Sequence, residues 1–206
     1  MTILWIGGAA DAGKTTLARG LAERLGCELY EYDRTDAAHH EALAAEHGDI
    51  RAFMAASLDA RWVEPTPEEL YRRAMRSFRL RWPLVLRELA GLAADPRQLV
   101  VVEGFGLLPD LVRPLMNDLR QGLWLVPTDE FKRGAWRRRG KPSWAAMVAD
   151  PDRGAANLWV RDAFIADEVA RQARAMGLAL VVNDGALFAS QLVELAAGQF
   201  APFLRG

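Results

Sequence analysis

Short runs of mostly aliphatic and β-branched residues recur along the chain, separated by longer stretches with the spacing of amphipathic helices. The runs lie at residues 3–6, 28–32, 98–102, 122–126 and 177–182. Such runs are typical of parallel strands that helices cover on both faces, because neither side of such a strand meets water. The pattern therefore predicts an α/β fold of three layers, with a five-stranded parallel sheet flanked by helices.

The first run is followed at once by a glycine-rich segment and then by a helical pattern. Leu17, Leu21 and Leu25 recur at helical spacing, and Gly26 follows them as a stop signal. A strand, a loop and a helix are therefore expected in direct succession at the start of the chain.

The region 36–94 is expected to be helical, with one interruption at residues 64–67. Thr66, Pro67 and Glu69 have the pattern of a helix start, in which Thr66 is the N-cap and Glu69 completes a capping box. Two helical segments are therefore predicted. No linker or internal repeat divides the sequence, so residues 1–206 are expected to form one domain with 36–94 as a helical insert.

Composition and charge narrow the classes of partner. The 206 residues are 51% hydrophobic, and 26 Lys and Arg against 27 Asp and Glu give a formal net charge of -1. A balanced charge gives no general attraction to nucleic acid or to an anionic membrane. A single cysteine, a start without signal-peptide character and the lack of a membrane-length apolar run favour the cytoplasm.

The glycine-rich segment has the pattern of a phosphate-binding loop: glycine, four residues, glycine, lysine and a hydroxyl residue. The expected nucleotide-binding residues are Gly8, Ala9, Ala10, Asp11, Ala12, Gly13, Lys14, Thr15 and Thr16. Backbone N–H groups of such a loop and the positive end of the following helix hold phosphates. Lys14 is expected to reach the β- and γ-phosphates of ATP, and Thr15 to hold Mg²⁺. Asp11 is interpreted as a turn residue.

The third apolar run ends in Glu103-Gly104. Functional groups of open α/β sheets lie at the carboxyl ends of the strands, so Glu103 is expected to face the phosphate loop. There it would bind Mg²⁺ or its waters, or accept a substrate hydroxyl. The alternative is an exposed glutamate that merely closes a strand.

The phosphate loop and Val101-Val102-Glu103-Gly104 together resemble the uridine kinase and phosphoribulokinase branch of P-loop kinases. The Asp-x-x-Gly and Asn-Lys-x-Asp patterns of Ras-type GTPases do not occur. A broader resemblance to nucleoside, nucleotide and sugar kinases follows from the order of elements. It implies acceptor-binding helices after the second strand and an arginine-bearing lid after the fourth strand, in the region 128–160.

The resemblance also implies roles for individual residues. Asp33, after the second run, matches a carboxylate that orients or deprotonates the acceptor hydroxyl, although it could instead cap the next helix. Arg133 and Arg137 share a helical face in the expected lid and would close over the phosphates. The alternatives for this segment are a solvated basic helix, or a nucleic-acid patch with Trp136 and Trp144 as stacking platforms.

Two further positions are expected near the nucleotide. Arg161, in a helix that is expected to open at Asn157, is either a phosphate ligand or the partner of a neighbouring aspartate. Asp184 follows the last run, where related kinases contact adenine, and is otherwise a turn residue.

The acceptor site is expected within the insert, whose aromatic and arginine side chains suit a planar group and an anion. The sequence does not choose among them, and His39 and His40 are expected at the surface. A homodimer is possible, since the seven tryptophans suit a core or an interface.

These features predict a kinase that transfers phosphate from ATP, with Mg²⁺, to a hydroxyl or phosphate of a small molecule. A nucleoside or nucleotide is the first expectation, followed by a sugar, an antibiotic hydroxyl or another small alcohol. The alternative from a different class is a nucleotide-binding regulatory module without kinase chemistry.

Overall fold

The computed structural model describes residues 1–92, 98–140 and 143–204, and its centre is a five-stranded parallel sheet with the order β2-β3-β1-β4-β5. The predicted fold class and strands are confirmed, with bounds that differ by a few residues. The strands are β1 (Thr2–Gly8), β2 (Glu28–Glu31), β3 (Leu99–Glu103), β4 (Gly122–Pro127) and β5 (Ala179–Asn183).

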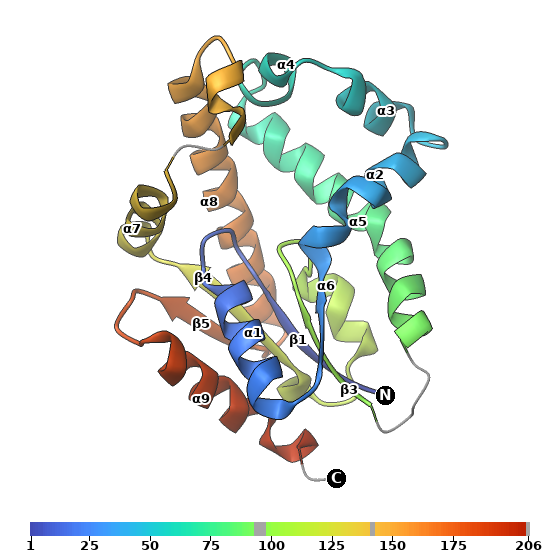
Figure 1. Cartoon of the computed structure of the whole chain (residues 1–206), viewed down its shortest axis with the longest axis vertical. Coiled ribbons are helices and arrows are strands. Elements are labelled where there is room, and N and C mark those ends of the chain that lie inside the picture. The colour runs from blue at the N-terminus through green and yellow to red at the C-terminus, as the bar shows by residue number, and fades with distance from the viewer. Residues whose placement is uncertain (93–97, 141–142, 205–206) are drawn as a thin grey trace.

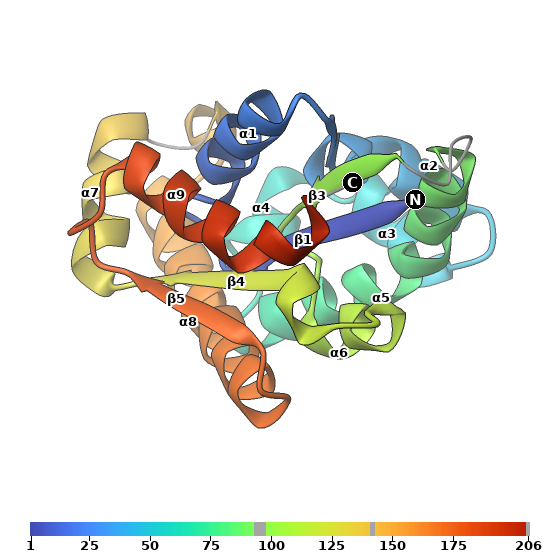
Figure 2. The same ribbon diagram turned by 90° about the horizontal axis from the view of Figure 1, so that it is seen from below.

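Helices cover both faces of this sheet (Figures 1 and 2). The helices are α1 (Lys14–Leu25), α2 (Asp36–Ala44), α3 (Gly48–Ala55), α4 (Leu58–Trp62), α5 (Pro67–Leu92), α6 (Pro109–Val112), α7 (Asp129–Arg139), α8 (Pro151–Ala175) and α9 (Ala189–Phe200). Short 3₁₀ turns lie at Tyr32–Thr35, Arg113–Leu115, Leu119–Gln121, Ser143–Met147 and Ala201–Phe203. In Figure 2, α1 and α9 lie on one side of the sheet, and α5, α6 and α8 lie on the other.

Alternate side chains of the strands enter two separate cores. Leu4 and Ile6 of β1 pack with Leu17 of α1 and Phe200 of α9, on one face. Trp5, between them, packs on the opposite face with the large apolar side chains of α5 and α8. Because both faces are buried, each strand needs apolar residues at successive positions, which explains the continuous runs in the sequence.

The register of the sheet brings three strand ends to one level. Ile6 of β1 lies beside Glu103 of β3, and Glu31 of β2 lies beside Glu103 on its other side. The segments that follow β1, β2 and β3 therefore start at the same edge of the sheet. This is the edge that carries the phosphate loop and the expected acidic residues.

The helical insert differs in part from its prediction. The capping box is confirmed: the Thr66 N–H donates to Glu69 Oε2 at 2.9 Å, and the Glu69 N–H donates to Thr66 Oγ1 at 3.3 Å. The expected first segment is instead divided into α2, α3 and α4. Ala56 is extended (φ −70°, ψ 152°), and the Ser57 side chain caps α4 by accepting from the Ala60 N–H, so a continuous helix is interrupted there.

The end of one helix and the start of another were also predicted from the sequence. Helix α1 ends as predicted at Gly26, which has a left-handed backbone. Helix α8 starts at Pro151 with an Asp150 cap, six residues before the predicted start at Asn157, because Asp150 accepts a hydrogen bond from the Arg153 N–H. None of the helices in the described ranges is both long and apolar enough to cross a membrane. Residues 93–94 of the expected insert and 141–142 of the expected lid lie outside the described residues.

Candidate active site

The phosphate loop joins β1 directly to α1. Gly8 (φ 134°) and Gly13 (φ 91°) have backbone angles that favour glycine, and a Cβ at Gly8 would lie 2.0 Å from the Leu125 carbonyl oxygen. Asp11 also has a positive φ, of 63°, which is consistent with its interpretation as a turn residue. The loop thus leads into the N-terminal turn of α1, where unpaired N–H groups favour an anion.

Lys14 is the first residue of α1, and its side chain is buried. Its Nζ donates a hydrogen bond to the Ala9 carbonyl oxygen at 2.6 Å, within the loop itself. Burial lowers the pKa of Lys14, while the nearby carboxylates of Asp33, Glu103 and Asp162 raise it. Lys14 is therefore a desolvated cation at the point where the loop would hold phosphates.

Glu103 ends β3 opposite the start of α1 and is almost fully buried, with 2% of its surface exposed. The Thr15 hydroxyl donates to Glu103 Oε1 at 3.2 Å, and Glu103 Oε2 has no hydrogen-bond partner among the described residues. Burial raises the pKa of Glu103, Lys14 opposes this, and Asp33 raises it further. The alternative of an exposed glutamate at a strand end is wrong, because the side chain turns inward towards α1.

These two oxygen donors fit Mg²⁺. Mg²⁺ is commonly held by one or two carboxylates together with substrate phosphates and water. An unpartnered buried carboxylate oxygen next to a threonine hydroxyl at a phosphate loop offers that donor set. The described part of the chain has no group of three or more His, Cys, Asp or Glu side chains that could hold a metal alone. Phosphate oxygens would therefore complete the coordination of the ion.

Asp33 lies in the 3₁₀ turn Tyr32–Thr35 that follows β2. The backbone N–H of Phe105, in the segment after Glu103, favours the ionised Asp33 carboxylate and lowers its pKa. Although the Asp33 side chain reaches solvent, surrounding protein atoms partly desolvate it and raise its pKa, while Lys14 opposes this. Asp33 does not occupy the N-cap of α2, which is Thr35. The structure thus brings Lys14, Asp33 and Glu103 into one electrostatically coupled group.

A buried arginine, which the sequence did not single out, supports the turn that carries Asp33. Arg81 of α5 donates to Asp36 Oδ1 at 2.6 Å and to the Tyr32 carbonyl oxygen at 2.9 Å, and its guanidinium carbon lies 3.9 Å from the centre of the Tyr32 ring. The expectation that His39 lies at the surface is wrong. His39 is buried, because it fills the space between Arg81 and Glu88, with its Nε2 3.0 Å from Glu88 Oε1.

The segment after β3 needs glycine because it wraps the Tyr32 ring. A Cβ at Gly104 would lie 2.3 Å from Tyr32 Cβ, and a Cβ at Gly106 would lie 2.3 Å from the Tyr32 hydroxyl oxygen. The glycine of the Glu103-Gly104 pair therefore has a packing role in this chain, beside the possible metal role of the glutamate.

The expected lid helix, α7, contacts the phosphate loop through Trp136. The Trp136 indole N–H donates to Asp11 Oδ2 at 2.6 Å, and its ring packs edge-on against Trp159 of α8. The Arg133 guanidinium carbon lies 5.2 Å from the centre of the Trp159 ring, and Arg137 is exposed. Both arginines lie on the helix that contacts the phosphate loop. Their binding of phosphate stays a prediction.

A buried charge cluster joins this helix to α8. Lys132 donates to Asp162 Oδ2 at 3.1 Å, and Arg161 donates to Asp162 Oδ1 at 2.5 Å. Arg161 was expected to be either a phosphate ligand or the partner of a neighbouring aspartate. The structure shows the pairing with Asp162. Two cations share one carboxylate here, which leaves positive charge beside the site. Sequence reasoning missed Lys132 and Asp162 because their pairing depends on how α7 packs on α8.

The end of β5 contacts the loop through Asn183 rather than Asp184. Asn183 is buried, and its side-chain amide donates to the Ala12 carbonyl oxygen at 3.0 Å. Asp184 is exposed and accepts from the Ala186 N–H at 2.9 Å, as a turn residue would. An adenine contact by Asp184 stays a prediction.

A cavity of about 750 Å³ lies between the helices of the insert, and its lining includes Phe105, after β3, and Arg161 of α8. Of the arginines that the sequence offered for the acceptor site, the cavity is lined by Arg61, Arg73 and Arg76. It also carries Phe53, Trp62 and Phe78. Asp33 is not among the lining residues, but Phe105, whose ring centre lies 5.6 Å from Lys14 Nζ, is one of them.

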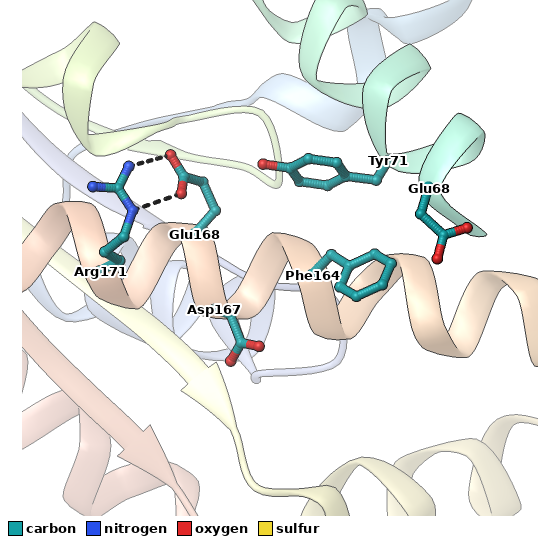
Figure 3. A pocket seen from close by; sticks show the side chains of 6 residues that line it. All are labelled: Glu68, Tyr71, Phe164, Asp167, Glu168 and Arg171. Carbon is teal, nitrogen blue, oxygen red and sulfur yellow. Dashed lines mark hydrogen bonds and ion pairs between the residues drawn. The ribbon is translucent and has the colours of Figure 1, made fainter. Parts of the chain in front are cut away.

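A second, shallower depression of about 360 Å³ lies on the outer side of the molecule, between α5 and α8 (Figure 3). Tyr71 and Phe164 face each other across it, and Glu168 and Arg171 form an ion pair at one end. None of the residues that line it belongs to the phosphate loop or the acidic group. We therefore assign the chemistry to the larger cavity.

Comparisons with known proteins agree with this architecture. No protein-family profile and no curated protein matches the sequence. The crystal structure of TT1252 from Thermus thermophilus superposes with a TM-score of 0.60 at 21% identity, over 100% of this chain and 98% of that chain. At this identity the likeness shows the fold alone, which is a five-stranded parallel sheet flanked by helices.

Two other solved structures are similar at a lower level. An unliganded sugar kinase from Janibacter sp. HTCC2649 gives a TM-score of 0.46 at 20% identity, over 100% of this chain and 99% of that chain. Shikimate kinase from Acinetobacter baumannii, in complex with shikimate, gives a TM-score of 0.46 at 21% identity, over 99% of this chain and 93% of that chain. At TM-scores below 0.5, these two likenesses bear on neither the fold nor the activity of this chain. The resemblance to the uridine kinase branch stays a prediction.

Proposed function

We propose that this chain is a kinase that transfers the γ-phosphoryl group of ATP, with Mg²⁺, to a hydroxyl or phosphate of a small molecule, a nucleoside or nucleotide first. The observation that carries the proposal is the meeting of Lys14, Asp33 and Glu103 at the phosphate loop, where the Phe105 ring lies between Lys14 and a cavity of about 750 Å³ that it lines. A regulatory nucleotide-binding module needs the loop but has no need of a partly desolvated carboxylate or of an acceptor-sized cavity.

The roles of the residues follow from their positions. The loop N–H groups and Lys14 would bind the β- and γ-phosphates, for which the Lys14 ammonium must leave the Ala9 carbonyl oxygen. Thr15 and Glu103 would hold Mg²⁺, which neutralises charge on the phosphates when it is bound. Arg133, Arg137 and Arg161 would approach the phosphates from the side of α7 and α8.

In the proposed reaction the acceptor hydroxyl oxygen forms a bond to the γ-phosphorus. The bond between that phosphorus and the β–γ bridging oxygen breaks, and ADP leaves with the electron pair. Asp33 takes the proton of the hydroxyl. Burial raises its pKa, which makes the carboxylate a stronger base, while Lys14 opposes this by favouring the ionised form.

The location and partners of the protein are part of the same proposal. We place the activity in the cytoplasm, where ATP is supplied and Cys27 stays reduced. We expect no nucleic-acid partner, because the formal net charge is -1 and because the two candidate stacking residues already pack on other rings, Trp136 against Trp159 and Trp144 against Trp62.

The test measures nucleotide binding and phosphoryl transfer separately. Lys14→Ala is expected to abolish the rise in melting temperature that ATP and Mg²⁺ cause in the parent protein. Asp33→Asn is expected to lower transfer about 100-fold or more, while the dissociation constant for ATP changes by less than about 3-fold. Asp167→Asn, an exposed carboxylate of the outer depression, is the matched control and should change neither.

Each contrary result has a distinct meaning. Full turnover in Asp33→Asn would remove Asp33 from the mechanism. A Lys14-dependent ATP response without transfer to any acceptor would favour the regulatory module, and no response to nucleotide would overturn the whole proposal.

A further inference from the structure

The wall of the larger cavity carries more positive than negative groups. Against three acidic side chains it has four arginines: Arg61, Arg73, Arg76 and Arg161. Asp49 is neutralised by Arg76, which lies 2.5 Å from it. Asp36 accepts a hydrogen bond at 2.6 Å from Arg81, which does not line the cavity, and lies 3.3 Å from His40 Nδ1. Two of the three acids therefore leave no negative charge for Arg61 or Arg73.

Arg61 is held in position by the end of α3. Its Nε donates to the Ala56 carbonyl oxygen at 3.0 Å, and its Nη2 donates to the Met54 carbonyl oxygen. Its guanidinium carbon also lies 5.2 Å from the centre of the Phe53 ring. Neutral carbonyl groups fix the side chain but do not cancel its charge, and no carboxylate of a described residue pairs with it. Arg61 is thus a positioned cation on the cavity wall.

Arg73 of α5 brings a second cation beside Arg61. Its Nη1 lies 3.5 Å from the carbonyl oxygen of Ala60, and this long hydrogen bond is the only one that it makes to a described residue. Glu64 is the remaining acid of the wall; it is exposed and forms no ion pair with a described residue. Two cations against one exposed acid leave one positive charge in excess on this part of the wall.

A different part of the wall belongs to the catalytic group. Phe105 and Arg161 both line the cavity, and the Arg161 guanidinium carbon lies 5.8 Å from the centre of the Phe105 ring. Lys14 Nζ lies 5.6 Å from the same ring centre. Because Lys132 and Arg161 share Asp162, one positive charge remains there for the phosphates of ATP. The excess charge on α4 and α5 is additional to this one.

We propose that the acceptor of the kinase is a hydroxy acid, and that Arg61 and Arg73 bind its single carboxylate. This inference rests on the proposed kinase function, and it places such an acid ahead of a neutral nucleoside. A planar carboxylate matches the hydrogen-bonding edge of a guanidinium group, and its one negative charge balances the excess on the wall. A neutral acceptor would leave that excess unbalanced. A phosphate ester carries about 1.5 to 2 negative charges at pH 7, which exceeds it beside Glu64.

The uncharged side chains of the wall indicate the body of this acid. Phe53, Trp62 and Phe78 are aromatic, and Ile50 and Leu70 are aliphatic. Such a wall favours an apolar body over one with several hydroxyl groups, because each buried hydroxyl group needs a hydrogen-bond partner. We therefore expect an aromatic or aliphatic body between the carboxylate and the reacting hydroxyl.

Binding is measured first and without ATP, so that the result does not depend on phosphoryl transfer. The probes are benzoate, benzamide and phenyl phosphate, which differ in the group attached to one ring. Dissociation constants are measured by titration calorimetry at matched ionic strength. Benzoate is expected to bind about 10-fold more tightly than benzamide and about 3-fold more tightly than phenyl phosphate.

Variants locate the carboxylate. Arg73→Gln is expected to weaken benzoate binding about 5-fold, and Arg61→Gln about 10-fold because Arg61 is less exposed. Glu64→Gln removes the opposing charge and should strengthen benzoate binding about 2-fold. Arg72→Gln, at an exposed neighbour on α5 that does not line the cavity, is the matched control and should leave it unchanged. Melting temperatures without ligand show whether Arg61→Gln, which loses two contacts with α3, stays folded; Arg73→Gln loses only one long hydrogen bond.

Transfer is measured separately, with saturating ATP and Mg²⁺. The acid 3-(hydroxymethyl)benzoate is expected to exceed 3-(hydroxymethyl)benzamide and uridine in kcat/KM by about 10-fold or more. Arg73→Gln should raise KM for the acid about 5-fold with little change in kcat, since the carboxylate is remote from the reacting hydroxyl.

The contrary outcomes separate this inference from the kinase proposal. Equal binding of benzoate and benzamide, or benzoate binding that Arg73→Gln does not weaken, would overturn the carboxylate site. Tighter binding of phenyl phosphate, or preferential transfer to uridine, would overturn the hydroxy acid and leave the kinase standing. Benzoate binding that depends on both arginines, without transfer to any of the alcohols, would overturn the kinase and leave the carboxylate site.

Discussion

At the scale of single residues, the site holds charged groups under conditions that do not favour their charged forms. Burial raises the pKa of Glu103 and lowers that of Lys14, and each group partly relieves the other. Such an arrangement suits a site in which a triphosphate and a metal ion bring their own charges. It also means that these residues are not optimal for stability.

Asp33 is also in an environment that disfavours its charged form, and the pH dependence of the free energy of unfolding should show this. Its pKa is raised in the folded state, so the folded protein binds the proton more readily than the unfolded chain, and the parent gains stability as pH falls through that pKa. Asp33→Asn lacks this titration. We expect the variant to melt about 1–3 °C above the parent near pH 8, because the side chain is exposed and the effect is modest.

The difference should shrink as the pH is lowered through the raised pKa of Asp33, because protonation then makes the Asp33 side chain of the parent neutral, as Asn is in the variant. Thermal melts of both proteins across this range measure it. A variant that melts below the parent at every pH would show that the ionised carboxylate stabilises the fold. Asp184→Asn, which changes an exposed aspartate after β5, serves as the control.

Sequence reasoning at this scale found the residues whose spacing carries a motif. Lys14, Thr15 and Glu103 meet as predicted because a loop of fixed length joins β1 to α1 and because strand ends align in a parallel sheet. It missed Arg81, since a buried arginine in a helix with many exposed arginines has no local signal. Only the packing of α5 on the turn after β2 distinguishes it.

At the scale of elements, helix α5 supports the catalytic turn through that arginine. Arg81→Met would leave the Tyr32 carbonyl oxygen and the Asp36 carboxylate without their donor. Asp36 is partly exposed and can be rehydrated, so we expect a loss of about 2–3 kcal/mol, or roughly 5–10 °C in melting temperature.

Arg79→Met on the same helix is the matched control for this change. Arg79 pairs with Asp110 at the surface, where an ion pair contributes little, and its loss should shift the melting temperature by less than about 2 °C. Equal shifts in the two variants would show that Arg81 has no special role.

The contact between α7 and the phosphate loop gives a prediction about motion. Trp136→Phe keeps a ring against Trp159 but removes the indole N–H that Asp11 accepts. Hydrogen bonds to charged groups contribute about 1.5–3 kcal/mol, so amide hydrogen exchange in α7 should become about 10-fold faster or more. Mass spectrometry of peptides from 129–139 measures this.

A graded control is available on the other side of the bond. Asp11→Asn keeps an acceptor oxygen and a residue type that tolerates a positive φ, so it should speed exchange less than Trp136→Phe. Unchanged exchange in Trp136→Phe would show that other contacts hold α7 in place. Sequence reasoning predicted a helix in this position but not this bond, because it joins residues 125 positions apart.

At the scale of the whole molecule, the order of elements could be predicted and the long-range pairing of polar side chains could not. The two core layers follow from the apolar runs. On one face of the sheet the first helix, α1, packs against the last, α9 (Figure 1). The pairs Lys132 with Asp162 and Asn183 with Ala12 depend on the final positions of whole helices and strands. These pairs lie around the candidate site. The sequence therefore predicted Lys14, Thr15 and Glu103 better than the side chains that surround them.

The close fit of Gly104 and Gly106 around Tyr32 has a consequence for how related sequences can differ. A side chain at position 106 is compatible with this backbone only when residue 32 is smaller than tyrosine, and one at position 104, which meets Tyr32 Cβ, only when residue 32 is glycine. The three positions are therefore expected to change as a set. In any lineage that replaces a glycine, the tyrosine must be lost first.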